Sequence, residues 1–524
     1  MYDLIIRNGK IVDGTGAPWF EADLAIKDGY VVGLGTITGE TVKEIDARGL
    51  FVTPGFIDMH THSDESVICD PQSVSKITQG VTTEVVGNCG YSAAPAVGGA
   101  INKVKESLAE FDLELSWSSF AEYLDHLRKA RPSVNLYPLV GHGILLRAVQ
   151  VGPNPEFRTA KLVRLLEEVL SQGARGFSTG LIYPPGCFAT TEEICELCKI
   201  IARKGGIYTT HIRNEGDSLL DAIAEAITIG ERTGVRVQVS HLKAAGPANH
   251  GRVTEALDLM VRARERGVDV AYDAYPYTAS STGLSAYLPD WVHRQDGFTL
   301  RQKLLDPTLS RRLREETESG VASRGGWGAI TVSWLSDQAN NWMVGSSIAE
   351  VAEITGQDPW LVVKELLLQN QAVEVICFSM SQDDVDRVIC HPLGTFGSDA
   401  TSRSVRGVLA QGKPHPRAFG TFPRIIRDYV RERRLLGLEE AIRKMTSAPA
   451  SRLGLLSRGI IRPGFAADLV GLDYAKVADK ATYLEPHQIS SGIAFVLVNG
   501  GLAYNANGEI TTPGFGKVLS SENG

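Results

Sequence analysis

Histidines follow several short apolar runs of this chain, in positions where they could bind a metal ion. His60 and His62 stand two residues apart after one such run. Because side chains at i and i+2 of an extended segment face the same side, both imidazoles point to one place. His211, His241 and Asp399 each end a further β-type run. Imidazole and carboxylate groups of this kind are typical ligands of zinc.

Cys89 ends another β-type run, within the glycine-framed segment 87–90. A thiolate is a soft, negative ligand suited to zinc. By contrast, Cys195 and Cys198 lie in a predicted helix without a second cysteine pair, and we expect them in the core. Any one of the candidate ligands could be an ordinary polar residue, but together they would be costly to bury without a cation.

These positions converge only if the chain forms a parallel barrel. Amphipathic helices such as 161–170 and 254–264 alternate with short apolar strands. Over roughly 350 residues this alternation favours a closed (β/α)₈ barrel, whose strands all end at one mouth. We expect its strands near residues 52–58, 81–87, 134–140, 174–179, 206–210, 235–240, 268–274 and 393–398.

The two ends of the chain differ in pattern from its middle. They consist of short β-type runs separated by Asp-Gly and Asn-Gly turns. We expect one small β-sandwich domain built from both termini, residues 1–50 plus 453–524, beside a catalytic barrel over 51–452. The stretch between the seventh and eighth strands is too long for one loop and predicts an inserted subdomain at about 284–390. The predicted fold class is therefore α/β, a metal-dependent TIM barrel with these two additions.

The composition is that of a globular enzyme. Of 524 residues, 43% are hydrophobic and 22% charged, which excludes disordered, collagen-like and coiled-coil chains. A net charge of −8 gives no support to nucleic-acid or membrane-surface binding. We expect no membrane span and no signal peptide. Seven cysteines, an odd and sparse number, favour a reducing compartment, and we expect a cytoplasmic protein. We expect a small-molecule substrate as its partner and leave the oligomeric state unspecified.

The chain resembles the amidohydrolase superfamily, and within it the N-acyl-D-amino-acid deacylases (D-aminoacylases), over nearly its whole length. Many amidohydrolases bridge two metals with a carboxylated lysine, but no lysine ends the expected fourth strand, 176–180. The D-aminoacylase branch is similar to this chain in placing a cysteine, here Cys89, in the bridging role. The motifs that carry the resemblance lie at residues 54–62, 87–90, 210–215, 240–243, 397–399, 415–424 and 459–470.

This resemblance implies a zinc-dependent hydrolase that cleaves the linear amide of N-acyl-D-amino acids. It also divides the expected ligands into a tighter zinc site and a second site that is weaker or partly vacant. The tighter zinc would be held by Cys89, His211 and His241, and the second site would be formed by His60, His62 and Asp399.

In the implied mechanism, Asp399 takes a proton from a zinc-activated water as general base and returns it to the leaving amine as general acid. The substrate carboxylate needs a cation, and Lys243, which we expect on the same side of its strand as the preceding ligand, is the leading candidate. Tyr183 and Tyr275 could donate hydrogen bonds to that carboxylate or to the oxyanion. His142 ends the third predicted strand, and its role as a further site residue stays open.

Two alternative functions remain. A cyclic-amide hydrolase of hydantoinase type, or a dipeptidase-like relative, would use the same chemistry, although Cys89 and Lys243 argue against a hydantoinase. A metal-free scaffold that binds partners without turnover would have lost ligands, yet every expected ligand is present. The preference for D substrates follows from the resemblance alone.

Overall fold

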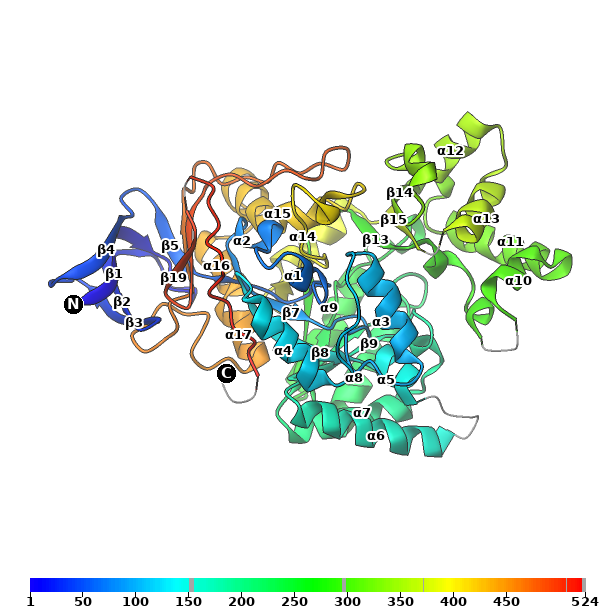
Figure 1. Cartoon of the computed structure of the whole chain (residues 1–524), viewed down its shortest axis with the longest axis horizontal. Helices are drawn as coiled ribbons and strands as arrows, with labels where there is room; N and C mark the ends of the chain where they lie inside the picture. The colour runs from blue at the N-terminus through cyan, green and yellow to red at the C-terminus, as the bar shows by residue number, and fades with distance from the viewer. Residues whose placement is uncertain (150–154, 295–297, 371, 506, 521–524) are drawn as a thin grey trace.

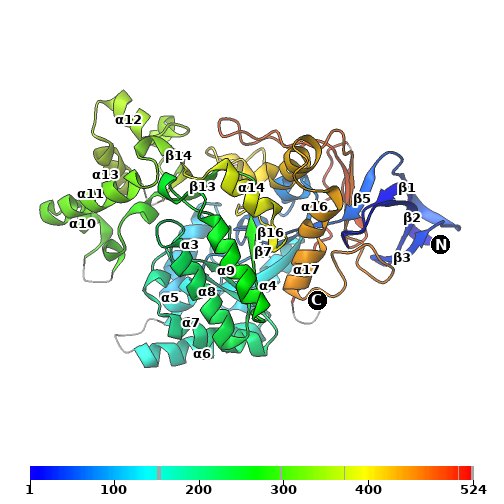
Figure 2. The ribbon, with the colours of Figure 1, turned by 180° about the vertical axis from the view of Figure 1, so that it is seen from behind.

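Three structural units make up the fold in the computed structural model, which describes residues 1–149, 155–294, 298–370, 372–505 and 507–520. A barrel lies in the middle, with a β-sheet from the chain termini at one end and an inserted subdomain at the other (Figures 1 and 2). Across these ranges, none of the helices combines the length and the apolar character that a membrane crossing requires.

The central unit is a nearly closed barrel of eight parallel strands, which confirms the predicted fold class. From β6 to β12, neighbouring strands in the barrel are also consecutive along the chain, as the alternation of strands and helices predicts, and β16 joins β12 after the three strands of another sheet. Every residue of β7 and β8 is buried, because helices cover the outside and side chains fill the inside. The strands are β6 (Phe56–Asp58), β7 (Val81–Val86), β8 (Asn135–Gly141), β9 (Gly176–Gly180), β10 (Ile207–His211), β11 (Arg236–Val239), β12 (Val270–Ala274) and β16 (Gly394–Phe396).

Amphipathic helices surround the barrel. In α7 the apolar residues, Cys195 and Cys198 among them, form one buried stripe, and the side chain of Thr190 caps the first turn by accepting from the backbone N–H of Glu193. The two predicted helices lie within α6 and α9. The helices of this unit include α3 (Ala100–Ala109), α4 (Phe120–Ala130), α5 (His142–Val149), α6 (Pro155–Ser171), α7 (Thr191–Arg203), α8 (Leu219–Thr233), α9 (Val253–Glu265), α14 (Gln382–Cys390), α15 (Arg417–Arg424), α16 (Leu438–Met445) and α17 (Ser447–Leu453).

The barrel closes between its first and last strands through a few backbone hydrogen bonds. The N–H of Met59 donates to the carbonyl of Phe396 at 3.1 Å, and the N–H of Asp399 donates to the carbonyl of His60 at 2.8 Å. These bonds connect the segment that follows β6 with the end of β16 and the segment after it. The closure therefore lies at the same end of the barrel as the predicted metal ligands.

A fully buried lysine reinforces this closure. Lys76, on α2 (Val74–Ile77), donates from Nζ to Asp58 Oδ2 at 3.0 Å and to Ser398 Oγ at 2.7 Å. Its Nζ also lies 3.7 Å from Glu84 Oε2, and all three charged side chains are inaccessible to solvent. Lys76 thus binds β6, β7 and the segment after β16 to one another.

Strands from both ends of the chain form one mixed sheet of eight strands. In it β1 pairs antiparallel with β2 and parallel with β4 and β5, while β17 pairs antiparallel with β5. Leu4, Ile26, Val52 and Leu497 contribute to a core of their own, separate from that of the barrel. The strands are β1 (Tyr2–Ile11), β2 (Phe20–Lys27), β3 (Tyr30–Gly35), β4 (Thr41–Asp46), β5 (Phe51–Pro54), β17 (Leu469–Leu472), β18 (Ile493–Val498) and β19 (Gly501–Tyr504).

The predicted first barrel strand, 52–58, is in fact two strands in two different sheets. β5 belongs to the terminal sheet and β6 to the barrel, and Gly55 alone separates them. A Cβ on Gly55 would lie 2.1 Å from Thr82 Oγ1, so only glycine fits where the chain passes from one sheet to the other. The alternation of side chains along a strand does not show where the chain passes from one sheet to another. The sequence pattern therefore predicted one strand where the structure has two.

The segment between β12 and β16 contains a three-stranded sheet with its own hydrophobic core. α14 packs instead against α9 and β16, as a helix of the barrel does. We therefore propose residues 279–378 as the inserted subdomain. Its elements are β13 (Ala279–Gly283), α10 (Leu300–Leu305), α11 (Pro307–Ala322), β14 (Ile330–Leu335), α12 (Ile348–Thr355), α13 (Pro359–Gln369) and β15 (Val373–Phe378).

The burial of Lys76 predicts a large loss of stability when its charge is removed. Lys76→Met leaves the carboxylates of Asp58 and Glu84 buried without their cation, a change that costs about 3–5 kcal/mol. We expect a clearly lower urea concentration at the unfolding midpoint, while Lys105→Met, at an exposed position of α3, leaves the midpoint unchanged. Equal midpoints for the two variants would contradict this role.

Candidate metal centre

All six predicted metal ligands lie together at the carboxyl ends of the barrel strands. Their side chains form two groups that share Cys89, and within each group the ligand atoms lie within 4.8 Å of one another. The positions follow directly from β6, β7, β10, β11 and β16, the strand ends that the sequence pattern indicates. One group contains His60, His62, Cys89 and Asp399, and the other contains Cys89, His211 and His241.

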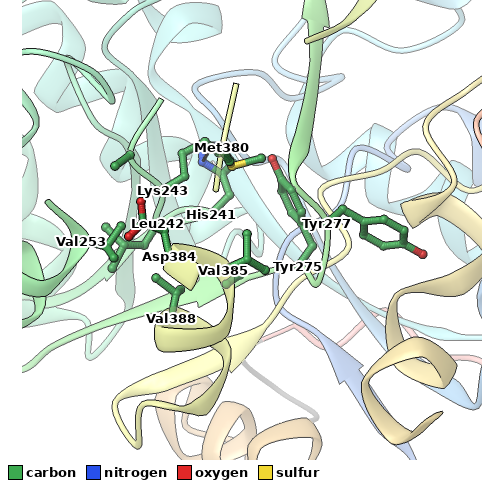
Figure 3. Close-up of a pocket in the computed structure, with 12 residues that line it drawn as sticks. His241, Leu242, Lys243, Val253, Tyr275, Tyr277, Met380, Asp384, Val385 and Val388 are labelled. Atoms are coloured by element: carbon green, nitrogen blue, oxygen red, sulfur yellow. Dashed lines mark hydrogen bonds between the residues drawn. The ribbon is translucent and has the colours of Figure 1, made fainter. Parts of the chain in front are cut away.

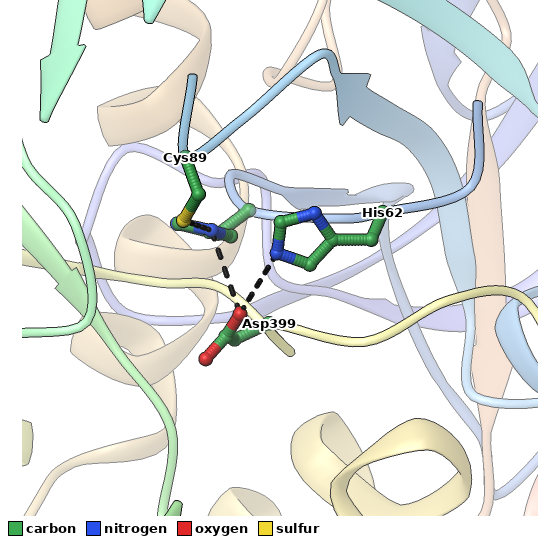
Figure 4. Close-up of side chains that lie close together, drawn as sticks. His62, Cys89 and Asp399 are labelled. Carbon is green, nitrogen blue, oxygen red and sulfur yellow. Dashed lines mark hydrogen bonds and ion pairs between the residues drawn. The ribbon is translucent and has the colours of Figure 1, made fainter. Parts of the chain in front are cut away.

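The sulfur of Cys89 belongs to both groups, and Figure 4 shows it near His62 and Asp399 of the first group. Its Sγ is 3.2 Å from His60 Nε2, 3.6 Å from His241 Nε2 and 3.7 Å from His211 Nδ1. One sulfur atom can therefore serve ions on either side of it. Since a thiolate carries a full negative charge, it also attracts cations at both positions.

Asp399 completes the first group from the opposite side. Its Oδ1 lies 3.1 Å from His62 Nε2 and 3.5 Å from His60 Nε2. Figure 4 shows the carboxylate of Asp399 facing the ring of His62. Its Oδ2 lies 2.8 Å from Nη1 of Arg417. The carboxylate therefore uses one oxygen toward the ligand cluster and the other toward a buried guanidinium.

Three of the ligands have backbone conformations that L-residues seldom adopt. The φ angles are 51° for Cys89, 37° for His241 and 51° for Asp399. A left-handed conformation of this kind is typically worth 1–3 kcal/mol of strain and is concentrated at functional sites. Hydrogen bonds hold it in place, for example from the N–H of His241 to Asp273 Oδ1 at 2.8 Å. The strained backbone at these three residues thus accompanies side chains that point into the ligand cluster.

The two anionic groups of the cluster are stabilised in their ionised forms. Burial raises the pKa of the Cys89 thiol, but the charge of His60 and the nearby ring nitrogens outweigh burial and bring this pKa well below its usual range. Burial likewise raises the pKa of Asp399, and the charges of Arg417 and His241 lower it well below that of an ordinary aspartate. A thiolate and a carboxylate thus lie among neutralising groups at neutral pH.

The same negative charges act on His62. Burial lowers its pKa, but hydrogen bonds with Asp399 and Cys89 raise the pKa to about 9. These anions therefore favour the protonated, positively charged form of His62. A divalent cation bound by the same atoms would supply this positive charge instead.

The donor set fits zinc in its chemistry. One thiolate, imidazoles and a carboxylate are its ordinary protein ligands. β9 ends in Ser178, Thr179 and Gly180, so the position from which many amidohydrolases supply a carboxylated lysine offers no lysine here. Cys89 is the one candidate ligand that the two groups of described residues share.

Two acidic residues support the ligands from outside. Asp273 Oδ1 lies 3.3 Å from His60 Nδ1 and also accepts the backbone bond of His241. Glu215 Oε1 lies 3.0 Å from His241 Nδ1 and 3.7 Å from His211 Nε2. The position of Asp273 near the end of β12 is a sequence feature that could have identified it, whereas Glu215 lies in a loop.

Lys243, which was predicted to bind a substrate carboxylate, contacts two side chains of the protein itself. Its Nζ donates to Glu215 Oε1 at 2.6 Å and lies 2.8 Å from His241 Nδ1. The side chain still lines the large pocket at the barrel mouth, which has a volume of about 860 Å³. A second, water-sized cavity is lined by residues after β11, by the end of β12 and the residues after it, and by α14; Tyr275 is one of its lining residues (Figure 3).

The two predicted tyrosines differ in their surroundings. Tyr183 lines the large pocket, and its hydroxyl lies 3.0 Å from Thr282 Oγ1 of the inserted subdomain. The hydroxyl of Tyr275 is buried and has no hydrogen-bond partner in the described part of the chain. Its ring lies 5.8 Å from Lys243 Nζ. His142 lies in neither ligand group; its Nε2 is 3.4 Å from Glu193 Oε1.

Arg417 is a residue of the pocket that sequence reasoning left without a role. Its guanidinium lies 4.6 Å from the ring centroid of Tyr275, and its Nε has no hydrogen-bond partner within the described ranges. The side chain is only 5% exposed, although it lines the large pocket. The motif 415–424 contains Arg417, but no strand pattern indicated that it faces the ligands.

Comparisons with known proteins agree with this geometry. The sequence profile described as the amidohydrolase family matches residues 43–174 and 337–504. An N-acyl-D-aspartate deacylase of Alcaligenes xylosoxydans xylosoxydans is 38% identical to this chain, over 98% of this chain and 95% of its own length.

Two solved structures are similar over almost the whole chain. An N-acyl-D-glutamate deacylase from Bordetella bronchiseptica, in complex with zinc and a phosphonate mimic of the tetrahedral intermediate, has a TM-score of 0.84 at 35% identity, covering 99% of this chain and 100% of that one. A D-aminoacylase described as having a binuclear metal centre has a TM-score of 0.83 at 34% identity, with the same coverage.

The shared sulfur predicts that one substitution weakens zinc binding in both ligand groups. We expect Cys89→Ser to lower zinc affinity more than about 100-fold, beyond the 10–100-fold typical of residues that only support ligands. Chelator competition followed by metal analysis measures the change. Cys69→Ser, at a partly buried cysteine outside both groups, should bind zinc as the parent does. Unchanged affinity in Cys89→Ser would exclude the sulfur as a ligand.

Proposed function

The chain belongs to the amidohydrolase family, and from this premise we propose that it is a zinc-dependent deacylase of N-acyl-D-amino acids. The proposed reaction is hydrolysis of a linear amide to a carboxylate and a free D-amino acid. The similar proteins act on N-acyl-D-aspartate and N-acyl-D-glutamate, and one is a D-aminoacylase, which supports a substrate of this class.

One observation carries the proposal: two groups of side chains that could hold a metal ion share the sulfur of Cys89, which lines a large pocket. We assign the tighter zinc to the group that includes His211 and His241, and the weaker one to the group that includes Asp399. Zinc held by such residues acts as a Lewis acid and makes water nucleophilic near neutral pH.

Asp399 is proposed as the group that moves the proton. Its Oδ2 is held by Arg417, so the carboxylate is fixed in orientation while Oδ1 faces the ligand cluster. A carboxylate in this position can accept a proton at Oδ1 from the attacking water. It can then return that proton to the nitrogen of the leaving amine.

Arg417 and Tyr275 are proposed to bind the substrate carboxylate. The guanidinium has an unpartnered Nε, the phenol has an unpartnered hydroxyl among the described residues, and the two side chains lie side by side. A charged hydrogen bond from an arginine favours a carboxylate strongly. Tyr183 and Lys243 line the large pocket together with Arg417, whereas Tyr275 lines the small cavity. Tyr183 and Lys243 remain proposed substrate contacts, although Lys243 is also held by Glu215.

A substrate screen tests the proposed function. With zinc present, we expect turnover of N-acetyl-D-amino acids and little or no turnover of the L enantiomers. The primary amide of the same N-acetyl-D-amino acid lacks the carboxylate that Arg417 would bind, so its kcat/KM should be about 100-fold lower, as expected for loss of a charged hydrogen-bond pair. The assay measures release of the free amine.

Other outcomes of the screen would contradict the proposal. Turnover of L substrates alone would reverse the assigned stereochemistry, and turnover of cyclic imides alone would indicate a hydantoinase-type reaction. Equal kcat/KM for the acid and the amide would remove Arg417 from substrate binding. Each outcome is compatible with the barrel and the ligand cluster, so the screen tests the reaction rather than the fold.

Asp399→Asn separates proton transfer from zinc binding in the tighter group. The amide cannot accept the proton, so kcat should fall about 10²–10⁴-fold. Zinc affinity in the group of Cys89, His211 and His241 should change little, because Asp399 is not part of it. Near-normal kcat in a protein with normal zinc content would remove Asp399 from the mechanism.

A further inference from the structure

The two histidines of the tighter group face Cys89 through different ring nitrogens. His241 turns Nε2 toward the sulfur and His211 turns Nδ1 toward it. A neutral imidazole carries a single N–H, and a nitrogen that binds a metal must be free of hydrogen. Zinc binding therefore requires the hydrogen on Nδ1 of His241 and on Nε2 of His211.

The outward nitrogen of His241 meets two groups of opposite hydrogen-bonding character. Glu215 Oε1 lies 3.0 Å from this Nδ1, and Lys243 Nζ lies 2.8 Å from it. The carboxylate can only accept a hydrogen bond and the ammonium can only donate one. Glu215 thus favours the hydrogen on Nδ1, whereas Lys243 favours the other tautomer, which blocks Nε2.

The same carboxylate oxygen faces His211. Its distance to His211 Nε2 is 3.7 Å, and this buried nitrogen has no hydrogen-bond partner within the described part of the chain. Glu215 is therefore the acidic group that stands beside both outward nitrogens of the tighter group. His60, in the other group, has Asp273 at its outward nitrogen instead.

Glu215 is also held firmly enough to act on the rings. Its backbone carbonyl accepts from the N–H of Ala245 at 2.7 Å, and the N–H of Gly216 donates to Asn214 Oδ1 at 2.8 Å within the same turn. The side chain is 16% exposed and is bound to Lys243 at 2.6 Å. Backbone bonds and an ion pair thus fix the position of its carboxylate.

We propose that Glu215 is a positioning residue that selects the zinc-binding tautomers of His211 and His241 and thereby sets the zinc affinity of the tighter group. The assignment rests on the zinc centre proposed above. One consequence concerns Lys243. Once the His241 hydrogen is on Nδ1, this nitrogen no longer accepts a bond from Lys243, and one N–H of the ammonium becomes available to the pocket that it lines.

The test compares Glu215→Gln with Glu225→Gln in the full chain. Glu225 is a matched control, because its side chain is 13% exposed and also forms an ion pair, with Arg213, away from the ligand cluster. Glutamine keeps the size of the side chain but loses its charge. We expect Glu215→Gln to bind zinc 10–100-fold more weakly in chelator competition, the usual effect of removing a partner of a metal-bound histidine. Glu225→Gln should bind zinc as the parent does.

Equal zinc affinity in the two variants would overturn the proposal. A second measurement uses the unmodified protein and does not depend on the folding of a variant. Two-bond ¹H–¹⁵N spectra of the zinc-loaded, histidine-labelled chain should show His241 with its hydrogen on Nδ1 and His211 with its hydrogen on Nε2. The opposite tautomer at His241 would refute the assignment.

These readouts need no substrate and therefore separate the inference from the proposed function. A chain that shows the expected zinc affinities and tautomers, yet hydrolyses no N-acyl-D-amino acid, refutes the proposed reaction and leaves the role of Glu215 intact. A parent chain that binds no zinc refutes both.

Discussion

Charge balance around the sulfur of Cys89 is the constraint on which the rest of the site depends. A buried thiolate next to a buried carboxylate, Asp399, is stable only when positive charge surrounds it. The imidazoles provide places for that charge, whether it is carried by protons or by a metal ion. The other cations nearby have their own counterions: Arg417 pairs with Asp399, and Lys243 pairs with Glu215. The excess negative charge therefore remains directed at the ligand cluster.

The ligand positions were predictable because strand ends can be recognised in the sequence. Short apolar runs separated by amphipathic helices predict parallel strands, and a closed parallel barrel brings all of their carboxyl ends together. That rule alone places Cys89 near His211 and His241, which are far away in the chain. It required no knowledge of any side-chain contact, and the structure brings these three residues together.

Other parts of the site could not be predicted in this way, because loops lack the regular spacing of apolar residues that reveals strands and helices. Arg417 follows Asp399 in a long connection, and only the folded chain shows that its guanidinium returns to that carboxylate. Lys243 was expected on the same side of its strand as His241, but its pairing with Glu215 depends on the turn after β10. The predicted strand 52–58 corresponds to two strands in different sheets, because the alternation of side chains does not reveal where the chain leaves one sheet for another.

The direct connection at Gly55 links the position of the terminal sheet to the positions of the candidate ligands that follow β6. Only Gly55, packed closely against Thr82, joins β5 to β6, so little chain is available to absorb a shift between the two sheets. We expect a displacement of the terminal sheet to reach His60 and His62 along the backbone, because both residues lie shortly after the end of β6. The two ends of the chain are consequently a poor place for modular exchange, since a transplanted sheet would have to reproduce this joint to leave the imidazoles in place.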